Sequence, residues 1–144
     1  MRSDRSSDRH CCQVVMSLLL LPGLDRGSVR RILADRESLP EDCDQLLEMV
    51  ARSDRMSPVQ SDIEYFSSAW DNSSRLLESL PAKNLEVIPI SSSRFPEPLQ
   101  QIDDAPVLLF VRGSVDVLQR HGIAVIGSRS ADDFGQQMAA TVGR

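Results

Sequence analysis

A short turn near the end of the chain carries the residues best suited to bind an anion. An apolar run over residues 123–126 stops at Gly127, and Ser128 and Arg129 follow it. Glycine lets a ligand approach the backbone, a serine hydroxyl donates a hydrogen bond, and an arginine guanidinium binds a phosphate through two parallel hydrogen bonds. Where such a turn leads from a strand into a helix, its free N–H groups and the helix dipole also favour an anion. The pattern therefore predicts a phosphate-binding turn.

The residues around this turn depart from the best-known nucleotide-binding motifs. A GxGxxG motif would need glycine at position 129, and no GxxxxGK segment follows. A plain strand-to-helix connection with an incidental arginine is the alternative. Asp132 and Asp133 weaken an anion site if their carboxylates face the turn, whereas they cap the next helix if they do not. Gly135, in the first turn of that helix, allows close packing or close approach of a ligand.

The elements upstream of the turn are expected to be helical. Apolar residues recur at helical spacing from Gln13, and we expect four helices, over about 13–21, 27–33, 39–54 and 57–80. Ser28 and Ser57 are the expected caps of the second and fourth helices. The opening residues are polar and lack periodicity, so residues 1–12 are predicted to form a flexible tail. The helical module is therefore expected to span residues 13–80.

After Pro81 the pattern changes to short apolar runs. We expect strands over 85–90, 107–113 and 122–127, a short helix-like stretch between the last two, and a final helix from Asp132 or Asp133. A helical module followed by the opening of an α/β domain is the predicted fold class. One helix after the last strand leaves strand edges exposed. Residues 85–144 are thus expected to be marginally stable unless they pair with another chain, such as a second copy in a homodimer.

Composition limits the possible functions. The net charge of −5 argues against a generally basic nucleic-acid binder, although residues 106–144 carry four basic and three acidic side chains. No apolar run is long enough to cross a membrane, and Asp4 and Asp8 interrupt a signal-peptide n-region, so a cytoplasmic location is expected. The three cysteines, Cys11, Cys12 and Cys43, contain no CxxC pair. They predict reduced thiols and no metal site, and no cofactor is expected.

Two blocks of this sequence resemble the DNA-processing protein A (DprA/Smf) family. The block "RFPEPLQQIDDAPVLLFVRG" follows the family pattern YP-x-x-L-x-x-I-x-D-x-P-x-x-L-(F/Y)-x-x-G, beginning at Phe95-Pro96. The block "IAVIGSRSADDFG" is similar to a strand leading into GSR-x-x-(S/T)-x-YG. Phe134 replaces the usual Tyr of this pattern, and Asp132 replaces its Ser or Thr. The resemblance covers about residues 85–142.

The resemblance implies a Rossmann-like domain, here over residues 81–144, that binds single-stranded DNA without catalysis. It further implies delivery of that DNA to the RecA recombinase in natural transformation and recombination. Carried over to this chain, Ser128 and Arg129 are phosphate contacts, and Gly127 and Gly135 are backbone-access positions. Two further nucleic-acid-binding candidates have structural alternatives: a core position for Phe134 and a solvated strand end for Arg112.

Some features separate this chain from the family pattern. A carboxylate at Asp132 would repel phosphate unless it caps the helix. The family's later glycine-rich and basic elements, and its RecA-contacting surface, would lie beyond Arg144, so we expect a truncated chain with partial activity. A nucleotide-binding or nucleotide-hydrolysing enzyme of the lysine-decarboxylase-like type shares this turn and is the alternative function, but it needs a PGGxGT-type segment that is absent. A protein-interaction module is the third hypothesis.

The helical module contains a second resemblance. "LLLLPGLDRGSVRRIL" resembles a helix-hairpin-helix, in which backbone amides hold a DNA phosphate without reading sequence. Asp25 replaces the second glycine of that turn, while Arg26, Arg30 and Arg31 could still reach a DNA backbone. A sterile-alpha-motif-like or hairpin domain that serves packing or contacts is the alternative.

Overall fold

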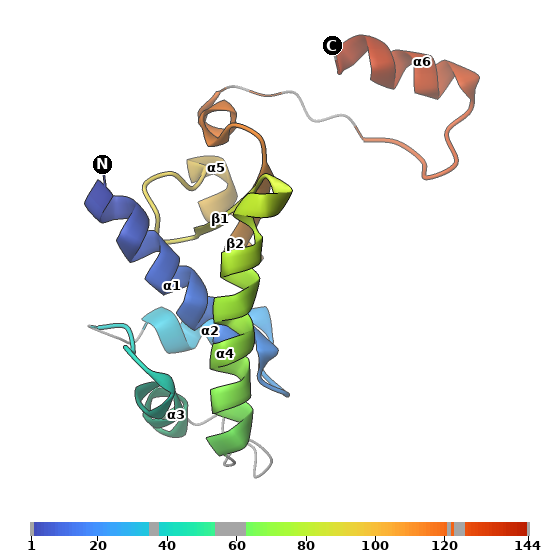
Figure 1. The fold of residues 1–144 in the computed structure, drawn as a ribbon. Helices are drawn as coiled ribbons and strands as arrows, with labels where there is room; N and C mark the ends of the chain where they lie inside the picture. Colours follow the sequence, from blue (N-terminus) through green and yellow to red (C-terminus); the bar gives the residue numbers. More distant parts are fainter. Residues whose placement is uncertain (1, 35–37, 54–62, 121, 123–125, 144) are drawn as a thin grey trace.

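A computed structural model describes residues 2–34, 38–53, 63–120, 122 and 126–143. Within these residues the body is built mainly from α1 (Arg2–Leu20), α2 (Arg26–Ala34), α3 (Cys43–Ala51) and α4 (Ile63–Ser79). The later elements are η2 (Pro81–Lys83), β1 (Leu85–Pro89), α5 (Glu97–Gln100), β2 (Leu108–Arg112), η3 (Val115–Gln119) and α6 (Asp133–Val142). In Figure 1, α1 and α4 pack together beside the two strands, and α6 is set apart from the body.

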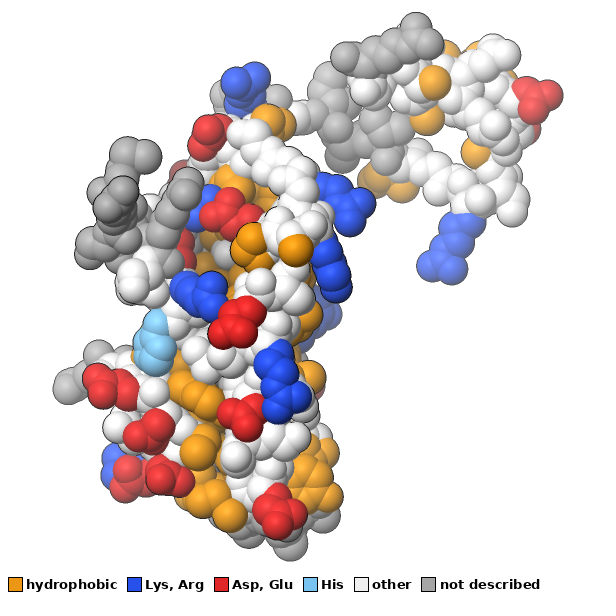
Figure 2. All heavy atoms as spheres, viewed as in Figure 1, with side chains coloured by type: hydrophobic (Ala, Val, Ile, Leu, Met, Phe, Trp, Pro, Cys, Tyr) orange, Lys and Arg blue, Asp and Glu red, His pale blue; other side chains and the backbone are white. Residues whose placement is uncertain are grey.

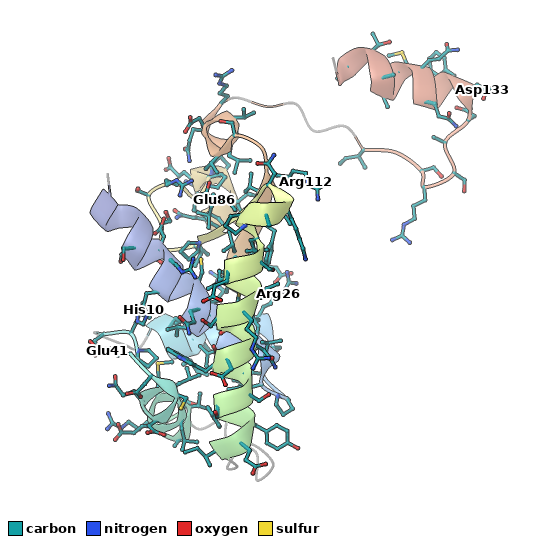
Figure 3. All side chains as sticks on the ribbon, in the orientation of Figure 1. His10, Arg26, Glu41, Glu86, Arg112 and Asp133 are labelled. Atoms are coloured by element: carbon teal, nitrogen blue, oxygen red, sulfur yellow. The ribbon has the colours of Figure 1, made fainter. Side chains whose placement is uncertain are left out.

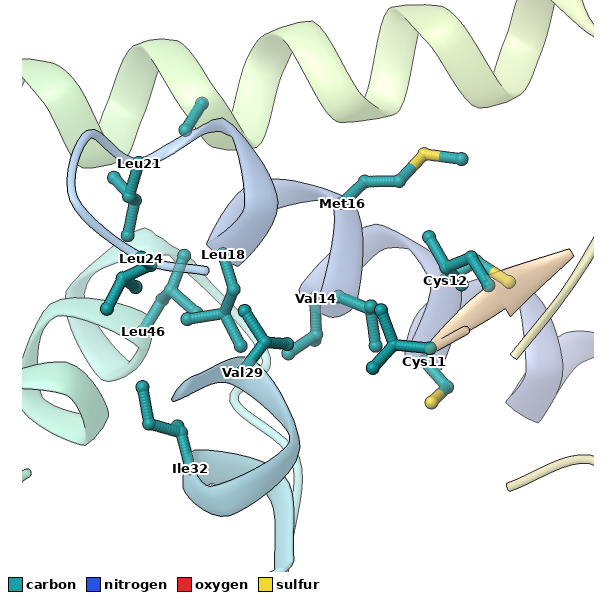
Figure 4. Packing of buried hydrophobic residues seen from close by; sticks show 14 of the residues in the cluster. Cys11, Cys12, Val14, Met16, Leu18, Leu21, Leu24, Val29, Ile32 and Leu46 are labelled. Carbon is teal, nitrogen blue, oxygen red and sulfur yellow. The ribbon is translucent and has the colours of Figure 1, made fainter. Parts of the chain in front are cut away.

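The helical core is centred on α1. Leu18 is fully buried among residues from α2 and α3, as Figure 4 shows for Val29 and Leu46. Small polar residues bring α1 and α4 close together: the Oγ atoms of Ser17 and Ser73, both fully buried, lie 2.7 Å apart. Each hydroxyl also lies within hydrogen-bond distance of a backbone carbonyl of its own helix, so one serine donates to its helix while the other donates across to the first. This pairing allows two buried polar groups in an apolar contact.

The predicted flexible tail is wrong for the described part of residues 1–12, because α1 already begins at Arg2. Tertiary contacts account for the difference. Cys11 and Cys12 are buried, and the His10 ring stands edge-on to Trp70 of α4, with centroids 6.4 Å apart. Such packing overrides the weak helical preference of a polar sequence.

The other expected helices are present with shifted ends. Asp42 caps α3 by accepting a 2.8 Å hydrogen bond from the backbone N–H of Gln45, so this helix begins later than predicted. Asp25 rather than Ser28 caps α2, through a 2.7 Å hydrogen bond from the Ser28 backbone N–H. The expected cap of the fourth helix at Ser57 lies outside the described residues.

Strands β1 and β2 lie where two of the strands were predicted, and they pair antiparallel, with Leu85 opposite Arg112 and Pro89 opposite Leu108. The mixture of helices with a small sheet agrees with the α/β class in its coarse sense. A Rossmann-like arrangement would need parallel strands joined by a crossover, usually a helix of several turns. The connection here contains the four-residue α5 instead, and the chain returns antiparallel.

The sheet shares its core with the helices. Leu85 and Val87 pack with buried Leu108 against the helical cluster, while Ile88 on the other face joins a second small cluster with Phe95. Alternating side chains therefore divide between the two faces of the sheet. Helices α1 to α4 and both strands contribute to one apolar cluster, and a domain boundary at residues 80–81 stays a prediction.

The segment after β2 is less packed. The helix-like stretch expected there is the 3₁₀ helix η3, and the strand expected over residues 122–127 falls largely on 123–125, outside the described residues. Helix α6 begins where predicted, and none of its residues is buried. None of the described helices combines the length and apolar character that a membrane span requires.

Candidate nucleic-acid interface

The turn before α6 is organised by Asp132. This residue has extended backbone, and its Oδ1 accepts a 2.8 Å hydrogen bond from the backbone N–H of Gly135. The Asp132 carbonyl also accepts the first helical hydrogen bond, from the backbone N–H of Gln136 at 2.9 Å. Of the two roles considered for Asp132, the structure shows the helix cap. The carboxylate therefore accepts from the Gly135 backbone N–H, a donor that an anion bound at this helix end would otherwise use.

Gly127 and Gly135, the two glycines of the motif, differ in the space around them. A Cβ at Gly135 would lie 3.2 Å from Asp132 Oδ1, so glycine provides room for the capping carboxylate. A Cβ at Gly127 would meet nothing within 4 Å. The packing of the described residues thus does not require glycine at position 127, and the space beside its backbone is open.

Ser128 and Arg129 are both exposed on this turn. Ser128 Oγ accepts a hydrogen bond from the backbone N–H of Ser130 at 3.2 Å, so its hydroxyl hydrogen is left to donate elsewhere. Arg129 forms no ion pair with any described carboxylate. The guanidinium is therefore not held by an ion pair to a carboxylate of the described residues.

A hollow of about 670 Å³ lies between this turn and α6. Gly127, Ser128 and Gly135 line it together with polar and apolar neighbours, which are Ile126, Ser130, Ala131, Asp132, Met138, Ala139 and Val142. Arg129 and Phe134 are not among the lining residues. Phe134 is 71% exposed, so the alternative of a core position for its ring is wrong in this structure.

Arg112 is exposed at the end of β2, in register with Leu85. Figure 3 shows Arg112 on the body and Asp133 at the start of the distant α6. The structure therefore brings Gly127, Ser128 and Gly135 to one hollow but does not bring Arg112 to it.

Two of the three arginines of the hairpin-like segment, Arg26 and Arg30, already have partners. Arg26 Nη2 lies 2.6 Å from Asp104 Oδ2, and Arg30 Nη1 donates to the backbone carbonyl of Asp103 at 2.7 Å. Gly23, in the turn before α2, has a φ of 82°, a conformation that glycine adopts without strain. These contacts tie α2 to the loop before β2, which is part of the first family-like block.

A buried polar network was not foreseen from the sequence. The Asp8 side chain, in a residue 9% exposed, accepts a 2.6 Å hydrogen bond from the Ser92 hydroxyl. Arg94 extends the network, with its guanidinium 4.0 Å from the Asp8 carboxylate and 2.6 Å from the Glu86 carboxylate. The signal in the sequence was Asp8 itself, which continues the helical spacing backward from Cys11, Cys12 and Val15. The network joins α1 to β1 and to the loop that follows it.

Cys11 and Cys12 are buried thiols whose ionisation is set by their surroundings. Burial raises the pKa of the Cys12 thiol to about 12, assisted by the negative charges of Cys11, Asp8 and Glu86. Burial likewise raises the pKa of Cys11, against a hydrogen bond from Ser91 that lowers it. Among the described residues no group of three or more His, Cys, Asp or Glu side chains could hold a metal ion.

Charge is distributed rather than concentrated on the viewed face. Figure 2 shows acidic and basic side chains interspersed over the helical body, and a basic side chain projecting from the segment before α6. This agrees with a chain whose net charge is −5. A nucleic acid would therefore be recognised through particular arginines and not through a general positive field.

Comparison with known proteins shows what the second part of the chain is similar to. Residues 86–144 match the family model described as DNA recombination-mediator protein A. This segment contains both family-like blocks and the turn before α6. Residues 86–144 are thus similar to the DNA recombination-mediator protein A family, and the resemblance indicated by the sequence motifs is confirmed.

A curated relative agrees with this assignment. The chain is 28% identical over 95 residues to the DNA processing protein DprA of Bacillus subtilis (strain 168), an alignment that covers 65% of this chain. The aligned part is 31% of the relative, so the chain spans about a third of the length of the curated relative. No solved structure matches the chain.

Proposed function

We propose that this chain binds single-stranded DNA, without catalysis, as part of a recombination mediator that acts in the cytoplasm. The match of residues 86–144 to the recombination-mediator family is the observation that carries this proposal. The nucleotide-hydrolysing alternative is not favoured by either match. The proposed fold around the site is the Rossmann-like domain expected for residues 81–144.

The proposed site is the turn before α6. Arg129 binds a backbone phosphate, the Ser128 hydroxyl donates to the same group, and Gly127 and Gly135 allow the strand to approach the backbone. Support comes from the exposure of Arg129, its lack of a described carboxylate partner, and the open space at Gly127. The exposed ring of Phe134 provides a surface on which a base can stack, and Arg112 provides a separate contact on the body.

The proposal extends to partners. The bound strand is handed to the RecA recombinase in natural transformation, and a homodimer covers the apolar surface of α6. Exposed Phe134, Met138 and Val142, spaced four residues apart along α6, support the need for a covering partner. The RecA-contacting surface is proposed for the longer family architecture, since this chain spans about a third of its relative.

Binding of the full chain to a fluorescently labelled oligo-dT, measured by anisotropy over a range of salt concentrations, tests the site. We expect Arg129→Ala to weaken binding about three- to tenfold and to lower the salt slope by about 0.7, the value for one phosphate contact on a single strand. Arg52→Ala is the matched control, because it removes the same charge from the C-cap of α3, away from the turn. Equal affinities for wild type and Arg129→Ala would show that the site is wrongly placed.

A further inference from the structure

The face of α2 that carries Arg26 and Arg30 is a basic surface outside the proposed site. The two residues are four apart and therefore share one side of the helix. Both are occupied by the loop before β2, through the Asp104 carboxylate and the Asp103 carbonyl. Arg31 is exposed beside them. This loop lies in the family-matched segment, whereas α2 precedes it.

The contact is of a kind that another anion can replace. The side chains of Arg26 and Asp104 are 54% and 76% exposed, so water competes with their attraction. A guanidinium binds phosphate oxygens with the same hydrogen-bond geometry that it uses for a carboxylate. The carboxylate of the neighbouring Asp25 accepts from the Ser28 backbone N–H and caps α2. Asp104 is thus the group whose displacement frees Arg26.

Arg26 and Arg112 are both labelled on the body in Figure 3. In the same view, Figure 2 shows Lys and Arg side chains along the edge of the body toward α6. A strand that contacts Arg112 can follow this edge toward α2. A row of separate cations suits a flexible single strand, which contacts a protein at successive phosphates.

We propose that Arg26 and Arg30 form a second contact for the backbone of single-stranded DNA, and that the loop at Asp103 and Asp104 occupies this contact in the free protein. A phosphodiester replaces the Asp104 carboxylate on Arg26 and the Asp103 carbonyl on Arg30. This inference rests on the proposed function for the identity of the ligand. In this inference the loop at Asp103 and Asp104 competes with DNA for Arg26 and Arg30. The loop therefore lowers the affinity of the protein for single-stranded DNA.

Anisotropy of labelled oligo-dT with the full chain tests this competition. We expect Asp104→Asn to raise affinity about two- to fivefold, the gain from releasing one exposed ion pair. Arg26→Ala should lower affinity by a similar factor, and the double variant should lose the gain. Glu48→Gln is the matched control, since it neutralises the exposed carboxylate of the Glu48–Arg52 pair and leaves affinity unchanged. Thermal unfolding of each variant verifies that the body remains folded.

The outcomes separate this inference from the site at Arg129. If Arg129→Ala weakens binding while Asp104→Asn behaves like Glu48→Gln, the α2 contact is overturned and the turn is retained. If Asp104→Asn gains affinity through Arg26 while Arg129→Ala has no effect, the inference stands and the turn is rejected. Absence of binding by both wild type and Asp104→Asn at low salt rejects both.

Discussion

Asp132 and Gly135 form one structural unit at the start of α6. The Asp132 carboxylate accepts the Gly135 backbone N–H at 2.8 Å, and a Cβ on Gly135 would lie 3.2 Å from the same oxygen. The aspartate caps the helix, and the glycine leaves room for it. The capping carboxylate also places a negative charge at the start of α6. In the proposed function, a phosphate of the DNA binds close to this charge.

Replacing Asp132 with serine should strengthen DNA binding. Serine keeps a side-chain oxygen for the cap but removes the charge that repels phosphate. We expect Asp132→Ser to raise the affinity for oligo-dT about two- to fivefold at low salt, with a smaller effect at high salt because the repulsion is screened. Asp133→Ser removes the same charge from a residue that does not cap the helix, and it should have the smaller effect. A larger effect at Asp133 would contradict this account.

The hydroxyl of Ser92 should contribute strongly to stability. Ser92→Ala removes the 2.6 Å donor to the buried Asp8 carboxylate, and an under-satisfied buried acceptor costs about 1–3 kcal/mol, more if it is charged. Urea unfolding followed by circular dichroism measures the change. Ser91→Ala is the control, because exposed Ser91 contacts only the Cys11 thiol in the described structure, at 3.3 Å. Equal losses from the two variants would disprove a special role for the network.

The buried thiol of Cys12 predicts that stability falls in alkaline solution. The folded pKa of Cys12 is raised from 9.0 to about 12, so below pH 9.0 the thiol is protonated in both states and its contribution is fully present. Above pH 9.0 the unfolded thiol ionises while the folded one does not, and the free energy of unfolding decreases toward pH 12. Urea titrations across this window should show a smaller decrease for Cys12→Ala than for wild type. The raised pKa of Cys11 leaves a residual decrease in that variant.

Hydrogen exchange should divide the described chain into two parts. Amides of α1 and β1 are expected to be protected, because both elements contribute fully buried residues to the core. Amides of α6 should exchange much faster, since none of its residues is buried and its hydrogen bonds face solvent. Mass spectrometry of a dilute sample provides the measurement. Protection of α6 that rises with protein concentration would reveal the proposed homodimer, whereas strong protection in the dilute monomer would contradict the prediction.

Local patterns predicted much of this fold. The two described strands and α6 lie where apolar runs and an acidic cap place them, because such signals depend on neighbouring residues only. The first turns of α1 were missed because Cys11 and Cys12 are buried against residues far along the chain. Antiparallel pairing of β1 and β2 also depends on tertiary contacts, which the alternation within each strand does not encode.

The candidate site could be predicted in part. The spacing of Gly127, Ser128 and Gly135 identified residues that the structure gathers around one hollow. The sequence could not decide the role of Asp132, since an aspartate before a helix can cap it or face a ligand. The hydrogen bond to Gly135 in the structure shows the cap. The pairing of Arg26 with Asp104 joins residues 78 positions apart and has no local signature. Binding by the proposed site residues stays a prediction.

The shared core of α1 and the strands has a consequence for synthesis on the ribosome. Helix α1 ends at Leu20, whereas β2 ends at Arg112, so roughly 90 residues are translated before all partners of α1 exist. At about 5–20 residues per second, the nascent helix waits on the order of 5–20 s with part of its apolar surface uncovered. Molecular chaperones that shield apolar segments thus have a defined target during translation, which is the buried face of α1.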